Sequence, residues 1–323
     1  ISIDLDQTRY DVRAVYESDG LFEKTSLRVA QNDYRHTEFE GADAGTRYDT
    51  DGTDARLELK HRPIGNLEGA IGIQFNRIDL KAEGDEAFVP GSETSQLSLF
   101  AFEEYSPTEN WVLQGSARIE RQTIKTPVAK TFEDTAAGAS IGAIRNLPRN
   151  LKLSANLALT ERHPNATELY ADGPHVAVQR FERGSVVLGN GVLDKEVSTN
   201  LDVTLRGATN RLEWTLTGYI NAVDDYVLLS PTGEEVDELP IFDYGQADVE
   251  LYGAEAELLV DLFEKDNEHL HARLFTDFVH GEEKSSGAYL PRLPPLRLGL
   301  GLHYRGQRLD GSITAVYNRK QDK

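Results

Sequence analysis

Residues 296–317 read LRLGLGLHYRGQRLDGSITAVY, and this stretch decides the fold of the chain. In its first half, apolar side chains occupy every second position, and arginine, glycine or histidine stands between them. The apolar positions are Leu296, Leu298, Leu300, Leu302 and Tyr304. A strict period of two is typical of a β-strand whose two faces meet different surroundings. A polar turn at 306–308 follows and the alternation resumes over 309–317, so the stretch predicts a β-hairpin with one apolar face.

The same hairpin pattern recurs along the whole chain and predicts fourteen strands and no helix. The strands are expected near 8–16, 25–29, 55–59, 69–75, 96–105, 111–120, 137–145, 151–159, 201–205, 212–220, 251–260, 270–278, 296–304 and 309–317. Short polar turns join the two strands of each hairpin, whereas long polar segments join one hairpin to the next. The long segments are 32–50, 81–93, 122–133, 161–195, 226–244 and 281–294.

The alternation of short and long connections indicates one architecture. Structureless loops longer than ~12–15 residues are uncommon in compact soluble domains. They are the rule in outer-membrane barrels, where short periplasmic turns alternate with long extracellular loops. We therefore predict an all-β fold, an antiparallel up-and-down transmembrane β-barrel, in a bacterial outer membrane. The alternative is a soluble β-sandwich or solenoid, which is disfavoured because it would leave open sheet edges.

On this interpretation the apolar faces of the strands contact outer-membrane lipid, and the intervening polar residues face the lumen. The lumen-facing set includes Arg9, Arg13, Arg28, Glu58, Lys60, Gln74, Arg118, Lys152 and Asp202. A charged lumen needs water or a polar plug, because unpaired charges are costly to bury.

Composition excludes several classes of protein. The 323 residues carry a formal net charge of −20, which would repel phosphate backbones, so we predict no nucleic-acid partner. The absence of cysteine excludes disulfides, thiolate metal sites and a cysteine nucleophile. The chain begins at Ile1 and contains no methionine, so we expect a processed or internal piece of a longer protein. The directions of the first and last strands predict an odd number of further strands at each end.

Several segments of the chain form recognisable motifs. The longest motif is ERHPNATELYADGPHVAVQRFERGSVVLGNGVLDKEVSTNLDV at 161–203. The others are DYRHTEFE at 33–40, EAFVP at 86–90, YGQADVELYGAEAEL at 244–258 and LPRLPPLRLGLGLHYR at 290–305. Together these motifs resemble the TonB-dependent outer-membrane receptors and, within them, the zinc receptors (the ZnuD-like subgroup). The chain departs from the family at His163 and Asn165, where small residues are usual, and at 189–192.

The resemblance implies a barrel of about 22 strands whose lumen is closed by a plug domain. Residues 1–323 would be part of that barrel, incomplete at both ends and without the plug. The implied function is uptake of a scarce metal or metal complex, energised by the TonB complex acting through the plug. A haem or siderophore receptor, a passive porin and a structural surface barrel remain alternatives. No nucleophile, base and orienting group cluster in the sequence, so we do not predict an enzyme.

Histidine and carboxylate side chains are the candidate metal ligands, since imidazole nitrogen and carboxylate oxygen suit Zn²⁺. We predict no intrinsic cofactor, and Zn²⁺ is the expected transported ligand. The resemblance implies Glu86 in EAFVP and His175 in GPH as ligands from the barrel, with partners in the plug. Further candidates in or beside predicted extracellular loops are His36, His163 and His280. The alternative for each is a polar loop residue packed against a neighbour, and structural roles are expected for His61, His269, His271 and His303.

Overall fold

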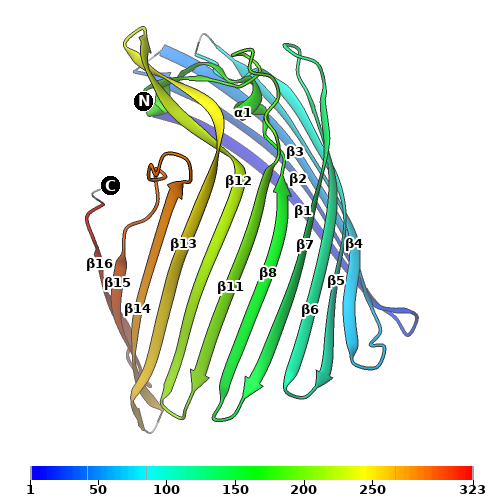
Figure 1. The fold of residues 1–323 in the computed structure, drawn as a ribbon, viewed down its shortest axis with the longest axis vertical. Helices are drawn as coiled ribbons and strands as arrows, with labels where there is room; N and C mark the ends of the chain where they lie inside the picture. Colours follow the sequence, from blue (N-terminus) through cyan, green and yellow to red (C-terminus); the bar gives the residue numbers. More distant parts are fainter. Residues whose placement is uncertain (1, 42, 85, 266, 322–323) are drawn as a thin grey trace.

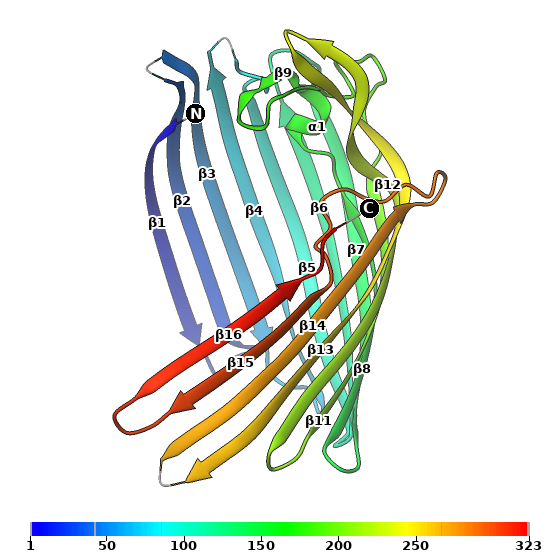
Figure 2. The same ribbon diagram turned by 90° about the vertical axis from the view of Figure 1, so that its left-hand side faces the viewer.

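The computed structural model describes residues 2–41, 43–84, 86–265 and 267–321, and it shows a curved antiparallel sheet (Figures 1 and 2). Fourteen strands follow one another in chain order and confirm the predicted fold class. They are β1 (Ser2–Glu17), β2 (Phe22–Glu40), β3 (Asp43–His61), β4 (Leu67–Glu83), β5 (Ser92–Thr108), β6 (Trp111–Lys125), β7 (Phe132–Leu147), β8 (Leu151–Arg162), β11 (Glu196–Ala208), β12 (Leu212–Val236), β13 (Leu239–Lys265), β14 (Glu268–Glu283), β15 (Arg297–Arg305) and β16 (Asp310–Asn318). Within the described residues the sheet does not close, so β1 and β16 form its two edges.

Two of the segments predicted as long loops are strands instead. Most of 32–50 belongs to β2 and β3, which pair as far as Glu40 and Asp43. Most of 226–244 belongs to β12 and β13, which pair as far as Val236 and Leu239. The prediction was wrong here because both faces of a strand that rises above the membrane meet water. The apolar alternation then disappears although the hydrogen-bond ladder continues.

The prediction of no helix was also wrong. The connection between β8 and β11 contains a one-turn helix, α1 (Ala166–Tyr170), and a short 3₁₀ segment (Val176–Val178). Asn165 caps α1, because its side chain accepts a hydrogen bond from the Glu168 amide while the Glu168 carboxylate accepts one from the Asn165 amide. This reciprocal capping box explains the departure from the family pattern at Asn165. None of the described helices is long and apolar enough to span a membrane.

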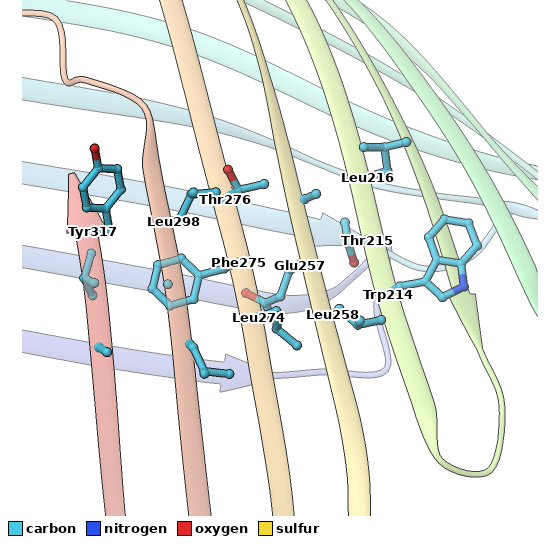
Figure 3. A pocket seen from close by; sticks show the side chains of 15 residues that line it. Trp214, Thr215, Leu216, Glu257, Leu258, Leu274, Phe275, Thr276, Leu298 and Tyr317 are labelled. Carbon is cyan, nitrogen blue, oxygen red and sulfur yellow. The ribbon is translucent and has the colours of Figure 1, made fainter. Parts of the chain in front are cut away.

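The two faces of the wall differ as the alternation predicts. Leu274 and Leu300 are paired across β14 and β15, and both are exposed on the outer face. A shallow apolar hollow on this face is lined by residues of β12 to β16, including Trp214, Leu216, Leu258, Leu274, Leu298 and Tyr317 (Figure 3). On the other face Arg297 donates a hydrogen bond to Asp277 (Nε to Oδ2, 2.6 Å). Ion pairs therefore line the lumen, and apolar side chains cover the surface that meets lipid.

Two clusters of buried apolar residues lie where loops fold against the lumen face of the wall. One cluster joins Ile124 and Phe132 of the wall to Leu169 and Tyr170 of α1. A second joins Val223 and Val249 to Leu290 in the connection between β14 and β15. Both clusters lie at the end of the barrel where the longer connections are, so the loops partly cover the mouth.

Candidate metal-binding mouth

The connection between β8 and β11 forms a structured flap over the mouth, and we call residues 163–195 the mouth flap. Figure 2 shows α1 and β9 (Asp172–His175) at the upper end of the wall. β9 pairs with β10 (Arg180–Arg183), and β10 pairs in parallel with the upper part of β13. β13 extends past the last residue paired with β14 and would otherwise present an open edge there. The mouth flap covers this edge.

Arg183 fixes the same contact by an ion pair. Its Nε and Nη2 atoms donate to the two carboxylate oxygens of Asp243 at 2.7 and 3.0 Å. Bidentate geometry of this kind is stronger and more specific than a single hydrogen bond. The Asp243 carboxylate raises the pKa of Arg183, so the guanidinium stays charged.

Glu182 is the buried anchor of the mouth flap. It is 1% exposed. Its Oε1 accepts from Arg180 (Nε, 2.7 Å) and lies 2.8 Å from His175 Nδ1, while its Oε2 accepts from the Tyr244 hydroxyl at 2.9 Å. Burial alone would raise the pKa of this carboxyl, but the hydrogen bonds from His175, Arg180 and Tyr244 outweigh burial and lower it. Glu182 is therefore an ionised carboxylate that joins β9, β10 and β13.

His175 packs directly against the EAFVP segment. Its ring stacks on the Phe88 ring with centroids 4.2 Å apart and planes 13° apart. The Asp172 amide also donates to the Phe88 carbonyl at 2.8 Å. The two segments that the sequence singled out, EAFVP and GPH, therefore meet at the mouth. Glu182 engages Nδ1, and within the described residues no hydrogen bond engages Nε2 of His175.

Glu86 lies on the side of the mouth formed by β2 and β3. A side chain at Gly45 would collide with its carboxylate. Burial raises the pKa of Tyr48 to about 12, and the charges of Glu38 and Glu86 add to this effect. These contacts place Glu86 close to Gly45 and Tyr48, at the top of the wall.

His36 belongs to the same neighbourhood. Its ring stacks on Tyr48 with centroids 4.7 Å apart, and its Nε2 lies 3.9 Å from a carboxylate oxygen of Glu38. Its Nδ1 is buried and has no hydrogen-bond partner among the described residues. Glu38 was not identified from the sequence. The signal that could have found it is its position two residues after His36, which places both side chains on the same face of a strand.

The other two candidates lie away from the mouth opening. His163, the first residue of the mouth flap, is 5% exposed and lies edge-on to Phe132, with Nδ1 3.4 Å from Asp134. His280 shares the outer face of β14 with Phe278, and its Nε2 lies 3.2 Å from Glu282. Its ring also contacts Tyr252 and Tyr289. Within the described residues no contact joins either histidine to His175, so their metal role stays a prediction.

The described residues contain no group of three or more histidine, aspartate or glutamate side chains placed to hold a metal ion. Glu86 and His175 can supply an oxygen and a nitrogen donor, while Zn²⁺ is usually four-coordinate. Completion of the site by residues of a plug stays a prediction.

A meandering antiparallel wall with an apolar outer face, a charged inner face and a structured flap at one end defines an outer-membrane β-barrel. The family model "TonB dependent receptor-like, beta-barrel" matches residues 2–323, so the chain belongs to the TonB-dependent receptor β-barrel family. Proteins of this family lie in the bacterial outer membrane, and so does this barrel.

Relatives and similar solved structures are named for different ligands. The vitamin B12 transporter BtuB of Photobacterium profundum is 22% identical over 223 residues, which are 68% of this chain and 32% of that protein. The copper transporter OprC superposes with a TM-score of 0.80 at 20% identity, covering 96% of this chain and 51% of OprC. The ferric enterobactin receptor of Pseudomonas aeruginosa superposes with a TM-score of 0.70 at 16% identity, covering 97% of this chain and 49% of the receptor. The chain thus spans about half the length of the two solved structures, and its match covers 32% of BtuB.

Proposed function

We propose that this barrel belongs to an outer-membrane receptor that takes up a scarce divalent metal, with Zn²⁺ as the transported ligand. The observation that supports this proposal is the contact between Phe88 and His175, which packs the EAFVP and GPH segments together at the mouth. Both segments are among the motifs that carry the sequence resemblance to zinc receptors.

The surroundings of His175 suit a metal ligand. A neutral imidazole that donates its Nδ1 proton to Glu182 carries its lone pair on Nε2. Metal-binding histidines commonly donate their other ring N–H to a carboxylate in this way, which fixes the tautomer and the ring orientation. Phe88 restricts the ring further by stacking. Glu86, two residues before Phe88 in the EAFVP segment, can add a carboxylate oxygen.

The donor atoms available in this chain favour Zn²⁺ over Cu⁺. The chain contains neither cysteine nor methionine, so it offers no thiolate or thioether. Those soft ligands are preferred by Cu⁺, whereas imidazole and carboxylate suit Zn²⁺. Transport would follow the family scheme, in which TonB moves a plug domain and releases the captured ion into the periplasm.

Calorimetry of Zn²⁺ binding to the full-length receptor tests the proposal. We expect His175→Ala and Glu86→Gln each to weaken binding at the mouth by at least about tenfold. His61→Ala is the matched control, because His61 lies at the opposite end of the barrel, where Glu103 and the Arg62 carbonyl engage its ring. Zn²⁺ binding that is absent, or that does not depend on His175 and Glu86, would contradict the assignment.

The principal alternative is uptake of a metal chelate or haem. Several relatives are named as receptors for siderophores, among them the ferric enterobactin receptor and the alcaligin receptor FauA. A full-length receptor that binds a ferric chelate but not Zn²⁺ would support this alternative. A passive porin would transport its solute without TonB, so TonB dependence of uptake in cells separates that class from both receptors.

A further inference from the structure

Two histidines lie side by side on the lumen wall, at the end of the barrel that carries the short turns. His271 of β14 and His303 of β15 are directly paired across the sheet. Their rings stack with centroids 5.0 Å apart and planes 8° apart. Within the described residues, neither ring has another ring contact, a hydrogen bond or an ion pair.

Strand register places both rings on the lumen face. His271 shares its face of β14 with Arg273, which forms an ion pair with Glu257. Gly301 lies opposite Arg273, and a Cβ at Gly301 would be 3.7 Å from His303 Nε2 and 3.8 Å from the Arg273 Cβ. Leu302 lies between Gly301 and His303 in the sequence and points to the lipid side. The two imidazoles therefore face the polar interior of the barrel.

We propose that His271 and His303 form a divalent-metal site on the lumen wall, separate from the mouth. The site takes a borderline ion such as Zn²⁺ through one nitrogen of each ring, and water completes the coordination. Directly opposed residues of an antiparallel pair have Cβ atoms about 4.5–5.5 Å apart. Rotation of the rings can therefore place one nitrogen of each ring roughly 2.0–2.1 Å from a shared Zn²⁺ ion, which is the length of a Zn–N bond.

The charges near the pair permit a cation to bind. Asp261 lies directly across from His271 on β13 and contributes a negative charge. Two arginines flank the pair on this face, and each has a carboxylate partner: Arg273 pairs with Glu257, and Arg305 lies 3.5 Å from Asp310. The alternative, a purely structural stack, explains the ring contact but leaves the ring nitrogens without a hydrogen-bond partner among the described residues.

Coordination by only two protein ligands suits a site that an ion occupies briefly while it crosses the barrel. Two protein donors bind an ion more weakly than a closed site of four, and an ion that crosses a pore must bind weakly enough to leave. The site lies toward the periplasmic turns, so it would meet an ion after release from the mouth. The inference does not depend on the proposed mouth site, because His271 and His303 would bind the ion whatever ligand the receptor captures.

Zn²⁺ calorimetry on the full-length receptor with both His175→Ala and Glu86→Gln isolates the lumen pair. His271→Phe and His303→Phe keep an aromatic ring in the stack and remove the donors. We expect each change to weaken Zn²⁺ binding on the order of 100-fold, because the second donor acts at a high effective concentration once the first has bound. The double variant should weaken binding little further, and His61→Phe should have no effect.

Cu²⁺ supplies a second, spectroscopic probe in the same background. The electron paramagnetic resonance spectrum should show coupling to two imidazole nitrogens, and either phenylalanine variant should abolish the two-nitrogen pattern. Zn²⁺ binding unaffected by the variants, or a Cu²⁺ spectrum unchanged by them, would overturn the proposal.

Discussion

At the scale of the residue, Glu182 contacts His175, Arg180 and Tyr244 at the mouth. It is 1% exposed, and its partners come from two short strands of the mouth flap and from the wall. A buried carboxylate of this kind contributes little net stability compared with an apolar replacement, but removing its charge leaves its partners uncompensated. Its role is therefore best examined by a substitution that keeps the shape.

Glu182→Gln should loosen the mouth flap in the full-length receptor. Removing one partner of a buried ion pair destabilises a protein by about 3–5 kcal/mol. Here the loss would weaken the docking of the mouth flap on the wall. Hydrogen–deuterium exchange should show faster exchange in β9 and β10 with no change in β4 and β5. Tyr244→Phe, which removes one hydrogen bond to the charged carboxylate, should have a smaller effect of about 1.5–3 kcal/mol. Equal protection in the wild type and in Glu182→Gln would refute this role.

At the scale of the element, the parts of the strands that cross the membrane differ in sequence pattern from the parts that rise above it. Where a strand crosses the membrane, alternation separates lipid from lumen, as for Leu300 on the outer face and Thr314 opposite Gly301 on the inner face. Where β2, β3, β12 and β13 rise above the membrane, alternation is absent and pairing alone maintains the strand.

Leu300→Arg should destabilise the complete barrel much more than Thr314→Arg. A charged side chain on the lipid face costs roughly 2–4 kcal/mol near the bilayer midplane, whereas an arginine in the lumen stays hydrated. Reversible unfolding in lipid vesicles, followed by tryptophan fluorescence, measures the difference. If the two variants are equally stable, the assignment of the faces is wrong.

At the scale of the whole molecule, the described wall is an open sheet with β1 and β16 at its edges and an apolar outer surface (Figure 2). Unpaired edges are templates for association, and an apolar belt in water adds a second driving force. The geometry is suited to a bilayer and to further strands, not to free solution.

The 323-residue chain by itself should therefore associate in buffer without detergent. Size-exclusion chromatography with light scattering should show large assemblies in buffer and smaller species in detergent micelles. A monodisperse monomer that unfolds cooperatively without detergent would favour a soluble β-sheet protein and contradict the membrane placement of the outer face.

The sequence by itself determined the number, order and facing of the membrane strands. Alternation such as that of Leu298, Leu300 and Leu302 is a local property, because the polarity of each side chain follows from whether its own strand face contacts lipid or water. The same reasoning failed for 32–50 and 226–244, where both faces meet water and no alternation marks the strand.

Only the tertiary structure decided which functional side chains meet. The stacking of His175 on Phe88 joins residues far apart in the sequence, and the Glu182 network needs β10 to dock on β13. The pairing of His271 with His303 depends on the register of β14 and β15, in which a slip of one residue would send one ring to the lipid face. These contacts arise from long-range packing, which leaves no periodic signal in the chain, so the residue types of the sites could be predicted but their partners could not.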